Sequence, residues 1–210
     1  MILNTYLIFR PEMNSGTILG YFLQALPIAC IVGIVFFVMR FFLLRKQQVQ
    51  IRWGHEILLV IYICYLVGLT SLIVLPANFW LSVYDGIFFE DWGEVGQVFR
   101  LGEVNLVPSV AKYLKGELSL GNWVKKMLIG NIAMFIPFGL FLPLLTKIKS
   151  KKAIMLIAVM VPICFEVTQL IFGRSFDVDD LICNSFGIII GALLAYTIWR
   201  KKIPDAQNDK

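Results

Sequence analysis

The stretch AIMLIAVMVPICFEVTQLIFGRSFDVDDLICNSFGIIIGALLAYTIW, residues 153–199, decides the fold. It consists of two long apolar runs, 153–172 and 181–199, on either side of a short polar segment. A transmembrane helix needs about 20 consecutive, mostly apolar residues, because the hydrocarbon core of a bilayer is about 30 Å thick. Each run has that length, so we predict two membrane-spanning helices joined by a loop over 173–180.

The rest of the chain has the same character. Of its 210 residues, 59% are hydrophobic and 16% are charged, and the mean hydropathy is +0.79. Three further apolar runs, 18–39, 57–80 and 127–145, are also long enough to span. We therefore predict an all-α membrane protein. A single membrane domain, residues 1–210, would hold five transmembrane helices, with a long loop between the second and the third.

Lysine and arginine residues predict the orientation. Three short segments hold twelve of the 19 basic residues, namely Arg40, Arg45, Lys46 and Arg52, then Lys147, Lys149, Lys151 and Lys152, then Arg200, Lys201, Lys202 and Lys210. Cytoplasmic segments are enriched in these residues, so the N-terminus is expected outside and the C-terminus in the cytoplasm of a multi-pass plasma-membrane protein. The same clustering accounts for the net charge of +5 without nucleic acid, and the expected partners are membrane lipids.

With this orientation, polar residues from distant parts of the sequence lie toward the outer face. Glu166 and Gln169 fall in the outer third of the fourth span, and their spacing puts them on one helix face. The loop 173–180 and the outer ends of the third and fifth spans lie at the same level. The predicted ligand-binding residues are Arg100, Asn105, Asn131, Glu166, Gln169, Arg174, Asp177, Asp180 and Asn184.

Glu166 is the most informative of these residues. A charged carboxyl at mid-span costs about 2.5–3.5 kcal/mol on insertion scales. Its side chain is therefore expected to face the bundle or a watery cavity, where Arg100 or Arg174 would pair with it. Two interpretations stay open: a ligand-contacting or catalytic group, or a member of an Arg–Glu–Gln network that only holds helices together.

Three carboxylates, Asp177, Asp179 and Asp180, stand within four residues at the start of the fifth span. Carboxylate oxygens are ligands for divalent cations, but acidic residues also cap helices and favour the positive end of the helix dipole. We favour the capping role, and we expect neither a metal nor a cofactor.

Four segments, taken in order and spacing, carry a family resemblance. They are NLVP (105–108), GNIAMFIPFG (130–139), EVTQ (166–169) and RSFDVDDLICNSFG (174–187). Together they resemble the VanZ-like family over about residues 100–199. That family is named for a membrane protein encoded beside glycopeptide-resistance genes and linked to teicoplanin resistance, so the resemblance implies a role in that process.

Three hypotheses about function follow. In the first, a polar pocket at the outer leaflet binds a lipoglycopeptide antibiotic such as teicoplanin, or the lipid-linked peptidoglycan precursor that the drug targets. Arg100 and Arg174 would hold phosphate or carboxylate groups there. In the second, the protein is an intramembrane enzyme that modifies a lipid or cell-wall precursor, with Glu166 as its acid or base. The third, a small transporter or flippase, requires a polar path to the cytoplasmic side, and the inner halves of the helices offer almost none.

Overall fold

The computed structural model describes residues 2–48, 50–93, 95, 99–116 and 122–201. For residues 18, 110, 114, 122–126 and 199–201 it describes the backbone alone. The chain divides into two compact units. The first unit holds Met1–Val104 and Val167–Phe176, and the second holds Asn105–Glu166 and Asp177–Lys210.

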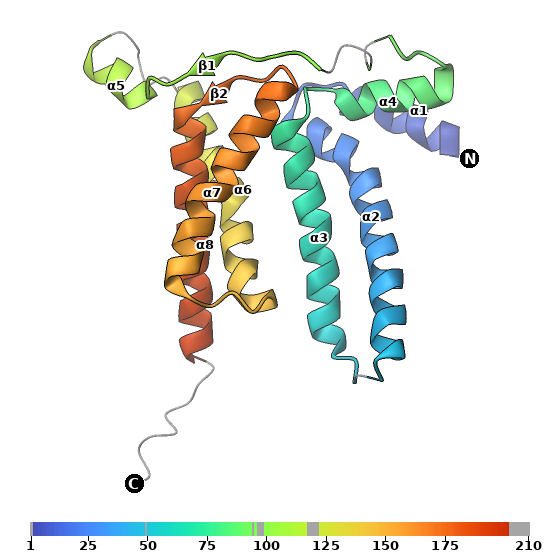
Figure 1. Ribbon diagram of the computed structural model, residues 1–210. Coiled ribbons are helices and arrows are strands. Elements are labelled where there is room, and N and C mark those ends of the chain that lie inside the picture. The colour runs from blue at the N-terminus through green and yellow to red at the C-terminus, as the bar shows by residue number, and fades with distance from the viewer. Residues whose placement is uncertain (1, 49, 94, 96–98, 117–121, 202–210) are drawn as a thin grey trace. The chain divides into compact units, whose positions relative to one another are not determined.

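The first unit is built on two long helices, α2 (Ile18–Lys46) and α3 (Trp53–Val74), which run side by side (Figure 1). Two shorter helices, α1 (Ile2–Met13) and α4 (Phe79–Phe89), lie across one end of this pair. Helix α2 begins where Thr17 accepts a hydrogen bond from the backbone N–H of Gly20 at 3.1 Å, as expected of an N-cap residue.

The second unit contains α5 (Ser109–Leu114), α6 (Asn122–Leu145), most of α7 (Lys151–Ile171) and α8 (Val178–Lys201). Two short strands, β1 (Val104–Asn105) and β2 (Phe176–Asp177), pair with each other. Phe135 of α6 has no exposed surface, and its ring contacts the ring of Phe165 on α7. An aromatic core therefore joins these two helices.

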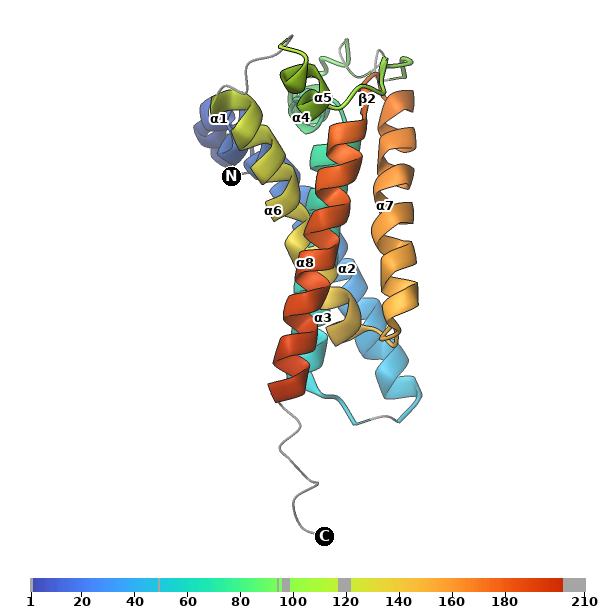
Figure 2. The same cartoon turned by 90° about the vertical axis from the view of Figure 1, so that its left-hand side faces the viewer.

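Helices α6 and α8 cross with their backbones in close contact (Figure 2). A Cβ atom added to Gly139 would overlap the backbone carbonyl of Ile188, and one added to Gly191 would overlap that of Ile136. Only glycine fits at such crossings, because any larger side chain would push the backbones apart. The glycines of both helices thus set the distance between them.

Five described helices are long and apolar enough to cross a membrane, and the chain is an all-α polytopic membrane protein as predicted. The spans over 127–145, 153–172 and 181–199 agree with α6, α7 and α8 to within a few residues. The predicted second span, 57–80, differs: α3 runs from Trp53 to Val74, and Trp80 belongs to α4. Pro76 comes two residues after Val74, and a proline disfavours the helical conformation in the residue before it, here Leu75.

The first span is also longer than predicted, because α2 continues to Lys46. Arg40 therefore lies inside the helix and not in a loop. Its Nε and Nη2 donate to the two carboxylate oxygens of Glu56 on α3, at 2.9 and 3.3 Å. This bidentate ion pair fastens the two helices near the end where they connect. The N-out orientation and the single-domain organisation stay predictions, and Lys202 and Lys210 lie outside the described residues.

Candidate functional site

In the second unit, the start of α8 gathers several of the predicted polar residues. Asp177 is the N-cap, since its Oδ1 accepts the backbone N–H of Asp179 at 2.9 Å. Its Oδ2 accepts from the side-chain amide of Asn105 at 2.9 Å, and the Oδ1 of Asn105 accepts from the ammonium of Lys112 at 3.3 Å. The predicted capping role of Asp177 is confirmed.

The two neighbouring aspartates have different partners. The carboxylate of Asp179, which is buried, accepts the backbone N–H of Ser109 at 2.8 Å, at the start of α5. The carboxylate of Asp180 accepts from the side-chain amide of Asn131 on α6. Among the described residues, no group of three or more candidate ligands could hold a metal ion. All three carboxylates instead connect parts of the second unit.

Glu166 ends the portion of α7 that belongs to the second unit, and its side chain has no exposed surface. Its Oε2 accepts the backbone N–H of Asp177 at 2.8 Å. We call Asn105, Asn131, Glu166, Asp177, Asp179 and Asp180 the carboxylate cluster. Asn184 is buried on α8, and its Oδ1 has no hydrogen-bond partner among the described residues. The pairing of Glu166 with an arginine stays a prediction.

The first unit holds the other predicted residues. The side-chain amide of Gln169 donates to the carbonyl of Ser175 at 3.1 Å. Arg174 reaches the end of α3, where its Nη1 donates to the carbonyls of Leu72 and Leu75 at 2.8 and 3.2 Å. These carbonyls have no partner within the helix, and the negative end of the helix dipole favours a cation there. The backbone thus fixes the position of this guanidinium.

Arg174 also lines a cavity of about 510 Å³ in the first unit, which we call the arginine cavity. Its walls come from the N-terminal part of α2, the end of α3 and the start of α4. Among the residues that line it, Arg174 alone carries a charge. The lining residues are Tyr21, Gln24, Ala25, Ser71, Leu72, Leu75, Pro76, Ala77, Asn78, Phe79, Trp80, Gly173 and Arg174.

Five other polar residues that line the arginine cavity were not predicted from the sequence, namely Tyr21, Gln24, Ser71, Asn78 and Trp80. Gln24 is buried on α2, and its amide nitrogen donates to the carbonyl of Met13 at 2.8 Å and to Asn78 at 2.9 Å. The indole Nε1 of Trp80 is buried and has no hydrogen-bond partner in the part of the chain that the structure describes. Gln24 was open to prediction, because a polar residue inside an apolar run is expected to face protein or a cavity and not lipid.

Arg100 lies outside this cavity. It is exposed, and its backbone N–H donates to the carbonyl of Ile171 at 3.2 Å. Of the predicted ligand-binding residues, Arg174 lines the arginine cavity and five belong to the carboxylate cluster. Their role in ligand binding stays a prediction.

A family model described as VanZ/LLP1 matches residues 25–200. No curated protein sequence and no solved structure matches the chain. The matched region is wider than the resemblance over residues 100–199, and it includes most of α2, from residue 25 onward, and the whole of α3. Since the match covers most of its length, the chain belongs to the VanZ/LLP1 family.

Proposed function

We propose that this VanZ-like membrane protein gives resistance to lipoglycopeptide antibiotics of the teicoplanin type, by binding an anionic amphiphile in the arginine cavity. The ligand would be the lipid-linked peptidoglycan precursor or the drug itself. The observation that carries the proposal is a cavity of about 510 Å³ with one charged lining residue, Arg174. This volume is in the range of small-molecule sites, about 300–1,000 Å³.

The chemistry of the cavity suits an anion attached to an apolar body. A guanidinium binds phosphate or carboxylate through charge-assisted hydrogen bonds. Phosphate or carboxylate oxygens would pair with this guanidinium, while the apolar walls, which include Leu72 and Phe79, would contact the rest of the ligand.

The first test is expression in a sensitive host, with inhibitory concentrations measured for teicoplanin and vancomycin. We expect protection against teicoplanin to exceed protection against vancomycin, since only the former carries an acyl chain toward the membrane. Arg174→Gln should abolish protection, and Arg174→Lys should retain part of it because the charge remains. Arg100→Gln is the matched control, an arginine of the same unit that does not line the cavity.

Membrane abundance of each variant is measured by immunoblotting. Full protection by Arg174→Gln at wild-type abundance would refute the cavity as the binding site. No protection by the wild-type protein against either drug would refute the proposal itself. Thermal shifts of the purified protein with farnesyl diphosphate, a short analogue of the precursor's lipid diphosphate, and with teicoplanin separate the two ligands.

The alternative enzymatic role depends on Glu166, and its contacts favour a structural role instead. The side chain is fully buried, and one carboxylate oxygen accepts the backbone N–H of Asp177. It lines neither of the two larger cavities of the first unit. A Glu166→Gln variant keeps an oxygen for that hydrogen bond but loses acid–base chemistry. Retained protection with an unchanged mass spectrum of extracted lipids is therefore expected.

A further inference from the structure

A second hollow of the first unit lies between α1, α2 and α4, with a volume of about 540 Å³. Its lining is almost entirely apolar, with Phe9 from α1, Leu26 and Ile31 from α2, and Ile87 and Phe88 from α4. We call it the acyl groove. It uses a different face of α2 from the arginine cavity, because Leu23, Leu26 and Pro27 line the groove whereas Gln24 and Ala25 line the cavity.

The hydroxyl groups at the acyl groove already have partners within the protein. Tyr6 donates to Asp85 at 2.6 Å, and Tyr84 donates to the carbonyl of Gln24 at 2.7 Å. Burial raises the pKa of each tyrosine to about 12, so both stay neutral at physiological pH. Thr5, the third lining residue with a hydroxyl, also has a partner. The groove therefore presents a carbon surface.

This surface restricts the occupant. A peptide, a sugar or a lipid headgroup would exchange its hydrogen bonds with water for contacts with carbon, and each unpaired polar group would cost free energy. A hydrocarbon chain has no hydrogen bonds to lose, and its burial in an apolar groove requires no polar partner. The lining therefore selects for a saturated or unsaturated acyl chain.

The groove also opens onto apolar surface that continues along a spanning helix. Leu26 and Ile31 are exposed on the side of α2, and Ile2 and Ile87 are exposed at the edges formed by α1 and α4. Helices α1 and α4, with 12 and 11 residues, are too short to cross a bilayer. They lie across the end of the pair formed by α2 and α3 (Figure 1), and both of these helices are long and apolar enough to span a membrane.

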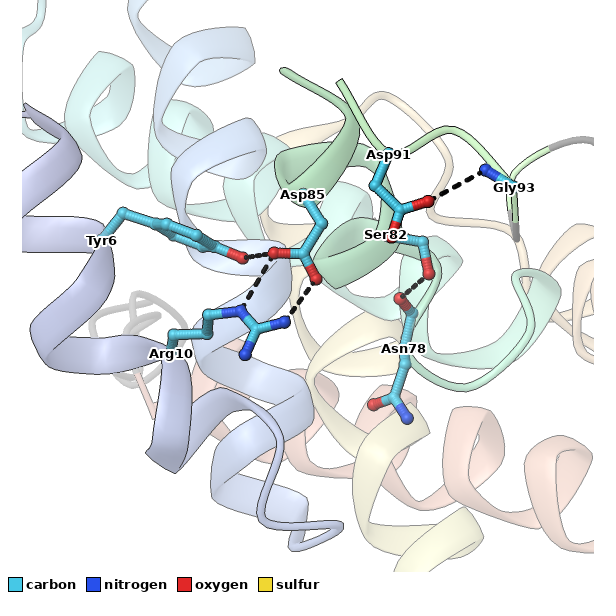
Figure 3. Close-up of polar contacts among 7 residues, drawn as sticks. All are labelled: Tyr6, Arg10, Asn78, Ser82, Asp85, Asp91 and Gly93. Carbon is cyan, nitrogen blue, oxygen red and sulfur yellow. Dashed lines mark hydrogen bonds and ion pairs between the residues drawn. The ribbon is translucent and has the colours of Figure 1, made fainter. Parts of the chain in front are cut away.

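An ion pair holds α1 against α4 (Figure 3). Arg10 donates to both carboxylate oxygens of Asp85, through Nε at 3.0 Å and Nη2 at 2.9 Å. Tyr6 donates to the Oδ1 of the same carboxylate. This contact fixes the two short helices to each other as one lid along the groove.

From these observations we infer that the acyl groove is a binding site for one acyl chain of a membrane lipid, with α1 and α4 as its lid. The site is separate from the arginine cavity and does not rest on the function proposed for that cavity. It adds a specific lipid contact to the general lipid-facing surface of the spanning helices.

The test uses the full chain in nanodiscs of phosphatidylglycerol, part of which carries a diazirine in the middle of one acyl chain. After irradiation, mass spectrometry of peptides locates the adducts. We expect adducts at Phe9, Leu26 and Ile87 to exceed those at Ile34 by about fivefold, the ratio for about 1 kcal/mol of preference. Ile34 is the reference because it is exposed on the same helix but does not line the groove.

Leu26→Trp should fill the groove and remove the excess of adducts at Phe9 and Ile87, whereas Ile34→Trp should leave it. Both positions are exposed, at 45% and 63%, so neither change disturbs a buried side chain. Arg174→Gln should also leave the adducts unchanged, which separates this site from the arginine cavity.

Equal labelling at Ile34 and at the groove in the wild-type protein would overturn the inference without any variant. It would also be overturned if light scattering showed that Leu26→Trp converts a dimer to a monomer while the adducts persist. That result would make a second copy of the chain the occupant.

Discussion

The contact between α1 and α4 gives the sharpest prediction about stability. Asp85→Asn keeps the shape of the side chain but removes its charge. The new amide keeps one oxygen as an acceptor, but its NH₂ group faces the Nη2 of Arg10, so that two donors meet (Figure 3). One charge-assisted hydrogen bond is lost and the second is weakened. We expect the lid formed by α1 to open more often.

The size of the effect follows from exposure. A hydrogen bond to a charged group contributes about 1.5–3 kcal/mol when it is buried, while exposed ion pairs contribute about 0.2–1 kcal/mol. The side chains of Arg10 and Asp85 are 42% and 17% exposed, which places this pair between the two limits. A loss of about 1.4 kcal/mol corresponds to a tenfold change in the opening equilibrium of α1.

Hydrogen exchange measures this opening. Isolated helices shorter than about 12–15 residues are marginal in water, so α1 depends on its contacts with α2 and α4. We expect exchange in α1 to become about tenfold faster in Asp85→Asn and to stay unchanged in α6 and α8. Asp91→Asn is the matched control, since Asp91 is exposed and, among the described residues, accepts only the N–H of Gly93, at 3.4 Å (Figure 3). Equal exchange of α1 in the two variants would refute the role of the ion pair.

Three further outcomes are expected. Arg10 holds the pKa of Asp85 below its usual range. The carboxylate therefore stabilises the fold above about pH 4, the pKa in the unfolded chain, and this contribution is lost only as pH falls through the lowered pKa. Hydrogen-exchange protection of α1, corrected for intrinsic exchange, should be the same at pH 5 and pH 7, and a loss of protection at pH 5 would contradict this. Gly139→Ala should destabilise the purified protein by about 1–3 kcal/mol in thermal melts because the added carbon meets the carbonyl of Ile188, while Gly130→Ala on the same helix, with nothing within 4 Å, should stabilise by up to about 1 kcal/mol. Asp177→Ala should lower the melting temperature through the loss of about 1 kcal/mol of capping, and an unchanged melting curve would contradict the capping role.

Apolar runs and basic clusters were sufficient to predict the spanning helices after residue 120. They were insufficient at residues 75–80, where apolar composition continues past the end of α3 and Pro76 is the only local signal of that end. The short helix α1 was not predicted because it contains Pro11 and no long apolar run. Its helical structure comes from packing on other helices, and such packing is not visible in local sequence.

The same limit applies to the polar residues. The predicted topology put Asn105, Asn131 and Asp180 at one level of the bilayer. In the second unit, Asn105 donates to Asp177 and Asn131 donates to Asp180. Topology cannot say which amide contacts which carboxylate, because that choice depends on helix rotation and loop path. The predicted topology also gave no reason to assign Arg174 and Asp177 to different sites. They stand three residues apart in the sequence but belong to different units.

Because Arg174 and the acidic residues of the carboxylate cluster belong to different units, the two groups are interpreted separately. Asp177, Asp179 and Asp180 each accept a hydrogen bond from a backbone N–H or a side-chain amide, and Glu166 accepts one from the backbone of Asp177. A carboxylate that holds a loop or a helix start in place is costly to withdraw for another task, because its donor would be left unpaired. Arg174 differs, since its backbone contacts fix a positive charge that already lines a cavity. The acidic residues are therefore better suited to shaping the fold, and the arginine to binding an anion.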